Sequence, residues 1–326
     1  MPPPLITLEE HFFSPSAPPS LTALYSEQLR HVPHLQSQLL SLTPTPRLTH
    51  NITLSILSHA PGLSSSPDSV IRTANDTLFT AIAASPSHLA GFATLDMDSP
   101  PLAASELRRC ITTLRFRGAL VDNTTSTGTF FDAPAYDIFW AAAEELNAPI
   151  YLHPTWAAPA QLERYRGNFS EGAAQSMASS AFGWHSEVGL HVLRLYASGL
   201  FDRRPGVKLI IGHMGEMIPF MLDRIQTLSK RWGEYRRDFK TVYRENIWIT
   251  TSGVWSIDPM RCILANTPID HILYSVDYPF QRNEVGLEWI KELEASGLVD
   301  EEQLNAIAYR NAEKLLGVTA PKESSS

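Results

Sequence analysis

Four short apolar runs of the sequence end on residues that can bind a metal ion. The first run, LITLEEHF, places Glu9 and His11 two positions apart. The later runs end on His153 in YLHP, His213 in GHMGE and Asp277 in SVDYP. Imidazole nitrogens and carboxylate oxygens together suit zinc, manganese or iron better than calcium, and a set without thiolates is typical of a catalytic rather than a structural site. The residue types therefore predict metal-dependent chemistry.

Each of these residues also has a purely structural explanation when it is taken alone. Glu9 and His11 fit a solvated strand-end carboxylate and a core histidine bonded to backbone. Asp277, close before a proline, fits a turn of the Asx type. His213 and Glu216 fit the start of a helix with an acid near its positive end. We favour the metal site because four separated runs all end on metal-capable residues.

Such residues need a frame that brings distant strand ends together. Strand-like apolar runs, bounded by turn residues, lie at 5–11, 52–59, 89–96, 117–123, 148–154, 207–213, 246–253 and 271–279. Segments with a helical period follow most of them, at 67–85, 100–114, 136–147, 184–200, 216–232, 285–296 and 301–317. This alternation predicts parallel pairing and an α/β fold of the (β/α)8 TIM-barrel type. An open doubly wound sheet is the alternative.

In a barrel of this type, the carboxyl ends of the strands form one rim, where active sites are built. Glu9 and His11 lie two residues apart on one strand, so their side chains share a face and point together into the barrel mouth. The chain is predicted to form a single domain over residues 1–326. Ser/Pro-rich loops are expected at 14–20, 41–46 and 61–67, and a flexible tail from about residue 318.

The composition excludes several classes of protein. Acidic residues outnumber basic ones by 34 to 26, giving a formal charge of −8, so a nucleic-acid partner is not expected. Two cysteines, Cys110 and Cys262, exclude a disulfide framework and indicate a reducing compartment. The opening MPPPLITLEEH does not read as a signal peptide, and no run of about eighteen uncharged apolar residues predicts a membrane span. We expect a cytoplasmic protein without a membrane partner.

Several blocks of the sequence resemble a known family. EEHF, YLHP, IIGHMGEMIPF, ITTSG and YSVDYPF are similar to the metal-dependent aromatic acid decarboxylases of the amidohydrolase superfamily, over about residues 5 to 317. The γ-resorcylate, 2,3-dihydroxybenzoate and salicylate decarboxylases are the nearer members, and aminocarboxymuconate semialdehyde decarboxylase is more distant. The resemblance implies a carboxy-lyase that releases CO2 and a phenol from an ortho-hydroxybenzoate-type acid. It also implies a homodimer or homotetramer.

The resemblance further implies one divalent ion, Zn2+ or Mn2+, with no organic cofactor, and the ligands Glu9, His11, His153 and Asp277. It implies catalytic roles for Asp277, His213 and Glu216, and substrate-binding roles for Arg224 and Phe280. The fourth strand lacks the terminal lysine that many superfamily hydrolases carboxylate to bridge two metals, which favours a single ion. The segment 14–50 and the loop 121–132 depart from the family pattern, so the preferred acid is left open.

The expected chemistry needs an acid close to the substrate ring. Direct loss of CO2 leaves a high-energy aryl carbanion, so protonation of the carboxyl-bearing carbon should come first. By resemblance the acid is Asp277, whose surroundings must then raise its pKa. Two other classes stay open: a lactonase or amidase of the same superfamily, in which the metal activates water, and a non-catalytic barrel.

Overall fold

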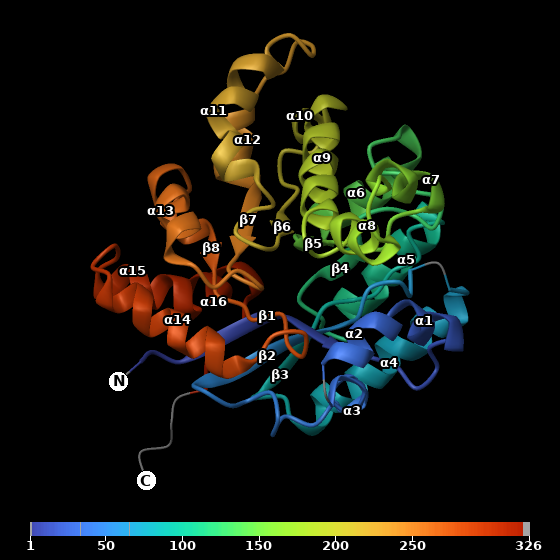
Figure 1. Cartoon of the computed structure of the whole chain (residues 1–326), viewed down its shortest axis with the longest axis vertical. Coiled ribbons are helices and arrows are strands. Elements are labelled where there is room, and N and C mark those ends of the chain that lie inside the picture. The colour runs from blue at the N-terminus through green and yellow to red at the C-terminus, as the bar shows by residue number, and fades with distance from the viewer. Residues whose placement is uncertain (1, 33, 65, 322–326) are drawn as a thin grey trace.

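The computed structural model describes residues 2–32, 34–64 and 66–321 and shows parallel strands surrounded by helices (Figure 1). Within these ranges there are eight strands: β1 (Leu5–Phe12), β2 (Ile52–His59), β3 (Leu89–Gly91), β4 (Ala119–Asp122), β5 (Ile150–His153), β6 (Leu209–Ile211), β7 (Ile247–Thr250) and β8 (Ile272–Leu273). All eight lie inside or overlap the predicted runs. Most are shorter than predicted, because the ends of the apolar runs continue into loops at the rim.

The strands form two hydrogen-bonded groups, β1-β2-β3 and β4-β5-β6-β7-β8. Isolated parallel bridges join the groups at both seams, from Ala93 to Ala119 and from Glu10 to Tyr278. At the second seam the N–H of His11 donates to the carbonyl oxygen of Tyr278 at 2.7 Å. The closed ring confirms the barrel, and the open-sheet alternative is wrong. The same seam brings Asp277 beside the end of β1.

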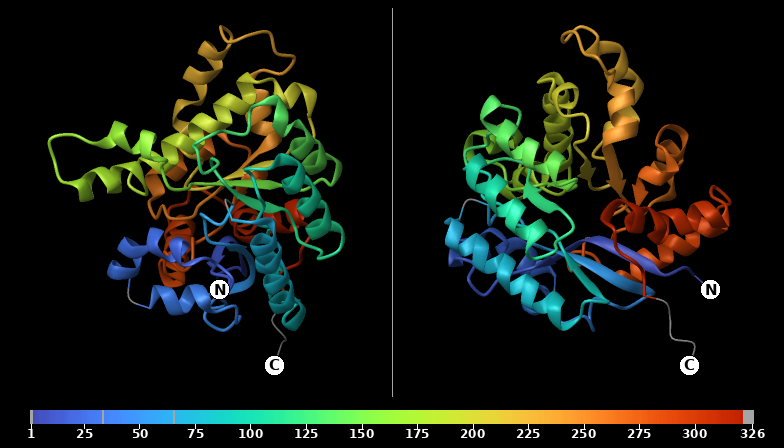
Figure 2. Two further views of the ribbon diagram at one scale, coloured as in Figure 1. Left: turned by 90° about the vertical axis from the view of Figure 1, so that its right-hand side faces the viewer. Right: turned by 180° about the vertical axis from the view of Figure 1, so that it is seen from behind.

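Helices cover the outside of the ring, as both views in Figure 2 show. They are α1 (Pro19–Leu24), α2 (Ser26–His31), α3 (Leu35–Leu40), α4 (Asp68–Ala84), α5 (Pro100–Thr112), α6 (Asp137–Glu145), α7 (Pro159–Leu162), α8 (Glu171–Ala178), α9 (Gly183–Ala197), α10 (Leu200–Arg203), α11 (Ile218–Ser229), α12 (Phe239–Asn246), α13 (Ile257–Asn266), α14 (Asn283–Ala295), α15 (Glu301–Asn305) and α16 (Asn311–Leu316). The seven predicted helical segments are confirmed. Sequence periodicity missed the short helices α1 to α3, α7, α8 and α10, and also α12 and α13.

A local irregularity in β1 aims Glu9 at the interior. The pairing of β1 with β2 shifts between Thr7 and Glu10. The N–H groups of Leu8 and Glu9 both donate to the hydroxyl oxygen of Ser275, at 3.0 and 2.8 Å. Leu8 packs in the same buried cluster as Tyr151, and the Tyr151 hydroxyl donates to the Glu9 carboxylate. A bulge of this kind redirects side chains near active sites, and here it turns two successive residues inward.

The chain leaves the barrel along α16. Val318 and Ala320 pack against the interior cluster, and the N–H of Ala320 donates to Glu313 Oε1 at 2.7 Å. The flexible tail predicted from about residue 318 therefore does not begin there, and residues 322–326 lie outside the described residues. The single-domain boundary stays a prediction. Among the described helices, none has the length and apolar character that crossing a bilayer requires.

Candidate active site

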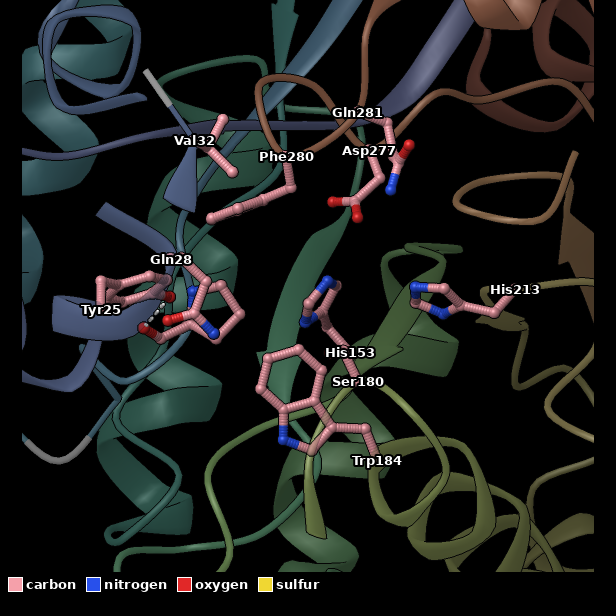
Figure 3. A pocket seen from close by; sticks show the side chains of 11 residues that line it. Tyr25, Gln28, Val32, His153, Ser180, Trp184, His213, Asp277, Phe280 and Gln281 are labelled. Carbon is pink, nitrogen blue, oxygen red and sulfur yellow. Dashed lines mark hydrogen bonds between the residues drawn. The ribbon is translucent and has the colours of Figure 1, made fainter. Parts of the chain in front are cut away.

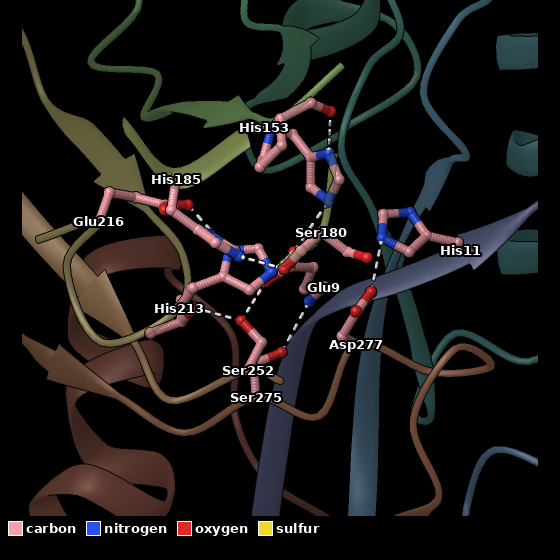
Figure 4. Close-up of polar contacts among 12 residues, drawn as sticks. Glu9, His11, His153, Ser180, His185, His213, Glu216, Ser252, Ser275 and Asp277 are labelled. Atoms are coloured by element: carbon pink, nitrogen blue, oxygen red, sulfur yellow. Dashed lines mark hydrogen bonds and ion pairs between the residues drawn. The ribbon is translucent and has the colours of Figure 1, made fainter. Parts of the chain in front are cut away.

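The four predicted metal ligands meet at the carboxyl ends of the strands (Figure 4). Glu9 and His11 come from β1, His153 is the last residue of β5, and Asp277 follows β8. Glu9 Oε1 lies 2.8 Å from His153 Nε2, and His11 Nε2 lies 3.2 Å from Asp277 Oδ1. One ligand atom from each residue lies within 4.8 Å of the others. Strands far apart in the sequence thus supply one compact donor set.

The orientation of these donors fits a divalent cation. His153 Nδ1 lies 2.7 Å from the carbonyl oxygen of Pro154, so Nδ1 donates a hydrogen bond and Nε2 keeps a free lone pair. Glu9 Oε1, His11 Nε2 and His153 Nε2 are buried and have no hydrogen-bond partner within the described parts of the chain. Glu9 Oε1 and His153 Nε2, for example, are close enough for an ion pair, but the angle between the two groups does not suit a hydrogen bond. Buried, converging donors of this kind would be costly without an ion between them.

The second oxygen of Glu9 is fixed from behind. Oε2 accepts hydrogen bonds from the hydroxyls of Tyr151 and Ser252, and Tyr151 in turn lies 2.9 Å from Thr250 Oγ1. Burial alone would raise the pKa of Glu9, but His213 above all, together with His153, outweighs it and lowers that pKa. Glu9 is therefore a carboxylate with one oxygen held by hydroxyls and the other free for a cation.

Asp277 behaves differently from Glu9. Burial, with the charge of Glu9 as the next cause, raises the pKa of Asp277 to about 8. Burial also lowers the pKa of His11, which keeps its imidazole neutral and able to act as a ligand. Two nearby carboxyl groups with pKa values pushed in opposite directions are typical of a base and an acid in one site.

Beside the donor set, Glu216 is held between two imidazoles (Figure 4). His213 Nδ1 lies 2.8 Å from Glu216 Oε1, and His185 Nδ1 lies 2.8 Å from Oε2. Burial alone would lower the pKa of His213, but Glu216 and Glu9 raise it to about 10. Burial alone would raise the pKa of Glu216, but His213 and His185 lower it. His185 was not predicted: it lies on α9, and no strand end points to it.

A cavity of about 190 Å³ opens next to these groups (Figure 3). Asp277, His153 and His213 form one side of it. The rest of the wall carries aromatic, apolar and amide side chains, namely Tyr25, Gln28, Val32, Pro61, Ser180, Trp184, Phe280 and Gln281. The rings of Tyr25 and Phe280 are stacked, with centroids 5.8 Å apart and an interplanar angle of 17°. Phe280 therefore lies in the cavity wall, and its contact with a substrate stays a prediction.

Arg224 lies elsewhere. Its side chain is exposed on α11, and it is absent from the described residues that line the cavity. Within one chain the structure therefore does not bring Arg224 to the substrate, and its substrate-binding role stays a prediction. The remaining predicted site residues form one contiguous group.

Comparison with known proteins places this site in a family. The amidohydrolase family model matches residues 67–318, and the chain belongs to the amidohydrolase family. It is 48% identical to the decarboxylase orsB of Emericella nidulans, over 99% of this chain and 100% of that protein. It is 34% identical to the gamma-resorcylate decarboxylase of Rhodococcus jostii, over 87% and 91% of the two chains.

A solved structure has the same fold and carries a metal. The dihydroxybenzoic acid decarboxylase from Polaromonas sp. JS666, with bound manganese and the inhibitor 2-nitroresorcinol, superposes with a TM-score of 0.85. It shares 30% identity with this chain and covers 97% of each. The relatives confirm the predicted decarboxylase class and argue against the hydrolase and the non-catalytic barrel. They also support a divalent metal at this site.

Proposed function

We propose that this enzyme decarboxylates an ortho-hydroxybenzoate-type acid with a single ring, releasing CO2 and a phenol. Glu9, His11, His153 and Asp277 would hold one divalent ion, Zn2+ or Mn2+. The observation that carries the proposal is the cavity, which has His153 and Asp277 of this donor set on one side and aromatic side chains on the other. A carboxylate and a phenol oxygen match the first side, and a ring matches the second.

The volume limits the substrate to one ring. A cavity of roughly 150 Å³ lined by apolar groups holds a benzene molecule, and this one measures about 190 Å³. Phe280 and Tyr25 can contact the faces of an aromatic ring, while Val32 and Pro61 leave room for small substituents. A bicyclic acid would not fit without movement of the wall.

The reaction replaces a carboxylate by a proton at one ring carbon. When bound, the ion supplies positive charge that favours the phenolate and holds the acid in place. Asp277 lines the cavity beside this group and donates a proton to the carboxyl-bearing carbon, which breaks the aromaticity of the ring. Cleavage of the carbon–carbon bond then releases CO2, and its electron pair restores the aromatic ring. Asp277 regains its proton from solvent.

His213 would orient the substrate or help to relay that proton. Its Nδ1 donates to Glu216, so the ring is held with Nε2 toward the cavity and 3.7 Å from Glu9 Oε1. Because Glu216 is buried, this hydrogen bond is shielded from water and holds the ring firmly. The proposed roles thus divide between a proton donor, Asp277, and a positioned imidazole, His213.

The assembly proposed is a homodimer or homotetramer in the cytoplasm. Met217, Phe220 and Met221 expose 45%, 83% and 37% of their surface along the start of α11, which projects from the barrel (Figure 1). Contiguous exposed apolar side chains favour a subunit interface. Cys110 and Cys262 are both free thiols, as expected in a reducing compartment. Sedimentation of wild type and Phe220→Glu tests the assembly, and a monomeric wild type would contradict it.

The activity is tested with metal-loaded protein and a panel of 2,6-dihydroxybenzoate, 2,3-dihydroxybenzoate, salicylate and orsellinate. CO2 and the phenol are measured together. We expect turnover of at least one acid, lost on chelation and in His153→Ala. Metal-loaded protein that releases no CO2 from any of the four acids would overturn the proposal.

A further inference from the structure

His185 has a position that the proposed chemistry leaves unexplained. It lies on the first turn of α9, and its side chain is 20% exposed, whereas that of Glu216 is fully buried. Both oxygens of Glu216 have an imidazole partner: His213 on Oε1 and His185 on Oε2, each at 2.8 Å. The centroids of the two rings are 4.6 Å apart. A buried carboxylate is thus shared between the cavity side and the solvent side of the protein.

The other ring nitrogen of His185 also has a hydrogen-bond partner. Nε2 lies 3.0 Å from the carbonyl oxygen of Ser180, a residue that lines the cavity. A carbonyl and a carboxylate only accept hydrogen bonds, so both ring nitrogens face acceptors, and the ring is held at both ends. His185 therefore ties Glu216 to the cavity wall.

The backbone around Glu216 needs such support. His213, Met214, Glu216 and Met217 all have φ between 49° and 66°, in the left-handed region that these residue types rarely adopt. A conformation of this kind persists only where its surroundings fix it. Helix α9 packs against this turn so closely that a Cβ on Gly189 would lie 2.8 Å from the carbonyl oxygen of Glu216. Helix α9, through Gly189 and His185, is one of the elements that pack against this turn.

We infer that His185 is a positioning residue that, through Glu216, fixes the His213 imidazole toward the substrate cavity. The inference rests on the proposed function, since it assigns a support to the same site. Without His185, Glu216 Oε2 loses its partner, and the buried carboxylate can rotate away from His213. The His213 ring then no longer faces the cavity in a single orientation.

A kinetic comparison tests this role. In His185→Ala, kcat should fall by about 10- to 100-fold, the usual effect of removing a supporting partner. KM and the metal content should stay near wild type, because His185 lies outside the donor set. Leu190→Ala, on the exposed side of the same helix, is the control and should behave as wild type. His185→Gln keeps an N–H donor and should retain more activity than His185→Ala.

Added imidazole distinguishes positioning from a loss of fold. The His185 side chain is partly exposed, so its removal leaves a space that imidazole can enter. Imidazole should restore kcat in His185→Ala. It should not do so in His185→Ala combined with Glu216→Gln, because the carboxylate that imidazole would contact is then replaced by an amide. Wild-type kcat in His185→Ala, or no rescue in a folded protein, would overturn the inference.

A readout independent of turnover separates this inference from the proposed function. In zinc-loaded protein, the His213 Nδ1 proton bonded to Glu216 should give a downfield proton NMR signal, which should weaken or vanish in His185→Ala. An unchanged signal would overturn the inference even if the enzyme decarboxylates the panel acids. If the signal is lost in His185→Ala but the wild type decarboxylates none of the panel acids, only the proposed function is rejected. Loss of one metal ion per chain in His185→Ala would also overturn the inference, because His185, His213 and Glu216 would then form a metal site of their own.

Discussion

The cavity has two sides that are built from different kinds of structure. On one side the strand ends supply buried residues whose positions are set by ladder partners, such as Asp122 opposite His153. On the other side the segment of α1, α2 and α3 supplies Tyr25, Gln28 and Val32. Each of these helices has six residues and no side-chain N-cap hydrogen bond.

The second side is held by a few specific bonds. The Tyr25 hydroxyl donates to the carbonyl oxygen of Pro61 at 2.7 Å, and the N–H of Ser14 donates to His59 Nε2 at 2.9 Å. A connecting segment of this type can change without disturbing the barrel, whereas a strand end cannot. The comparison indicates that the strand side fixes the reaction and the helical side selects the acid.

The largest effect is expected from Glu9→Gln. Glu9 is fully buried, and its free oxygen belongs to the donor set, so a neutral amide removes the charge that balances the ion. Metal content should fall from one ion per chain toward zero, and decarboxylation with it, as measured by elemental analysis and CO2 release. The same change in the exposed Glu288 of α14 should have neither effect. A metal-loaded, active Glu9→Gln would remove Glu9 from the ligands.

The second prediction concerns the proton. Asp277→Asn keeps an oxygen for the ion but cannot donate an acidic proton to the ring. We expect kcat to fall by roughly 10²- to 10⁴-fold, the range for loss of a general acid. Metal content should be measured in parallel. Full activity in a metal-replete variant would exclude Asp277 as the acid.

The strand side is also the part that the sequence predicts well. Each apolar run ends on a polar residue at the rim, so one rule places Glu9, His11, His153 and Asp277 in a single site without any knowledge of loops. The alternation of strands and helices favoured a closed barrel, with the open doubly wound sheet as the alternative. The rule could not say that β1 would bulge at Leu8 and Glu9, because a bulge depends on contacts with Ser275 from the far end of the chain.

The helical side escaped prediction for physical reasons. Six residues complete fewer than two helical turns, so α1 to α3 show no periodicity, and Pro18 and Pro19 resemble a loop. His185 was missed because its role depends on α9 meeting the turn at Glu216, a contact between distant segments. Arg224, a motif position carried over by resemblance, lies on an exposed helix face of the single chain, so its substrate-binding role stays a prediction.

The third prediction tests the packing that supports the strand side. His191 on α9 accepts the N–H of Phe131 at Nε2 and contacts Asn123 Oδ1 through Nδ1, which ties down the loop after β4. Burial lowers the pKa of His191 from 6.5 to about 3. Because the folded form resists protonation, this stability is complete above pH 6.5 and is lost as the pH falls toward 3.

The expected loss from this one residue is about 2 kcal/mol between pH 7 and pH 5. Urea unfolding of wild type and His191→Gln at both pH values measures it. The variant should be less stable at pH 7 but should lose less on acidification. An equal loss in both proteins would show that other groups cause the acid sensitivity.

The smallest effect is expected on the helical side, and it addresses selectivity rather than rate. Gln28 lines the cavity, and its Oε1 is buried without a hydrogen-bond partner among the described residues. A ring hydroxyl on the substrate can supply that partner, and one hydrogen bond contributes about 0.5–1.5 kcal/mol. Gln28→Leu should therefore lower kcat/KM for a dihydroxybenzoate relative to salicylate by up to about tenfold. Gln36→Leu, an exposed glutamine on α3, is the matched control.

The ratio of the two substrates is the decisive quantity in this experiment. If Gln28 contacts a ring hydroxyl, its replacement changes the ratio while metal content and the salicylate rate stay near wild type. If Gln28→Leu lowers both substrates equally, the segment acts only by closing the cavity, and selectivity must come from the strand side or from Phe280. That second result would break the division of roles between the two sides, because the reaction and the choice of acid would then depend on the same strand-end residues.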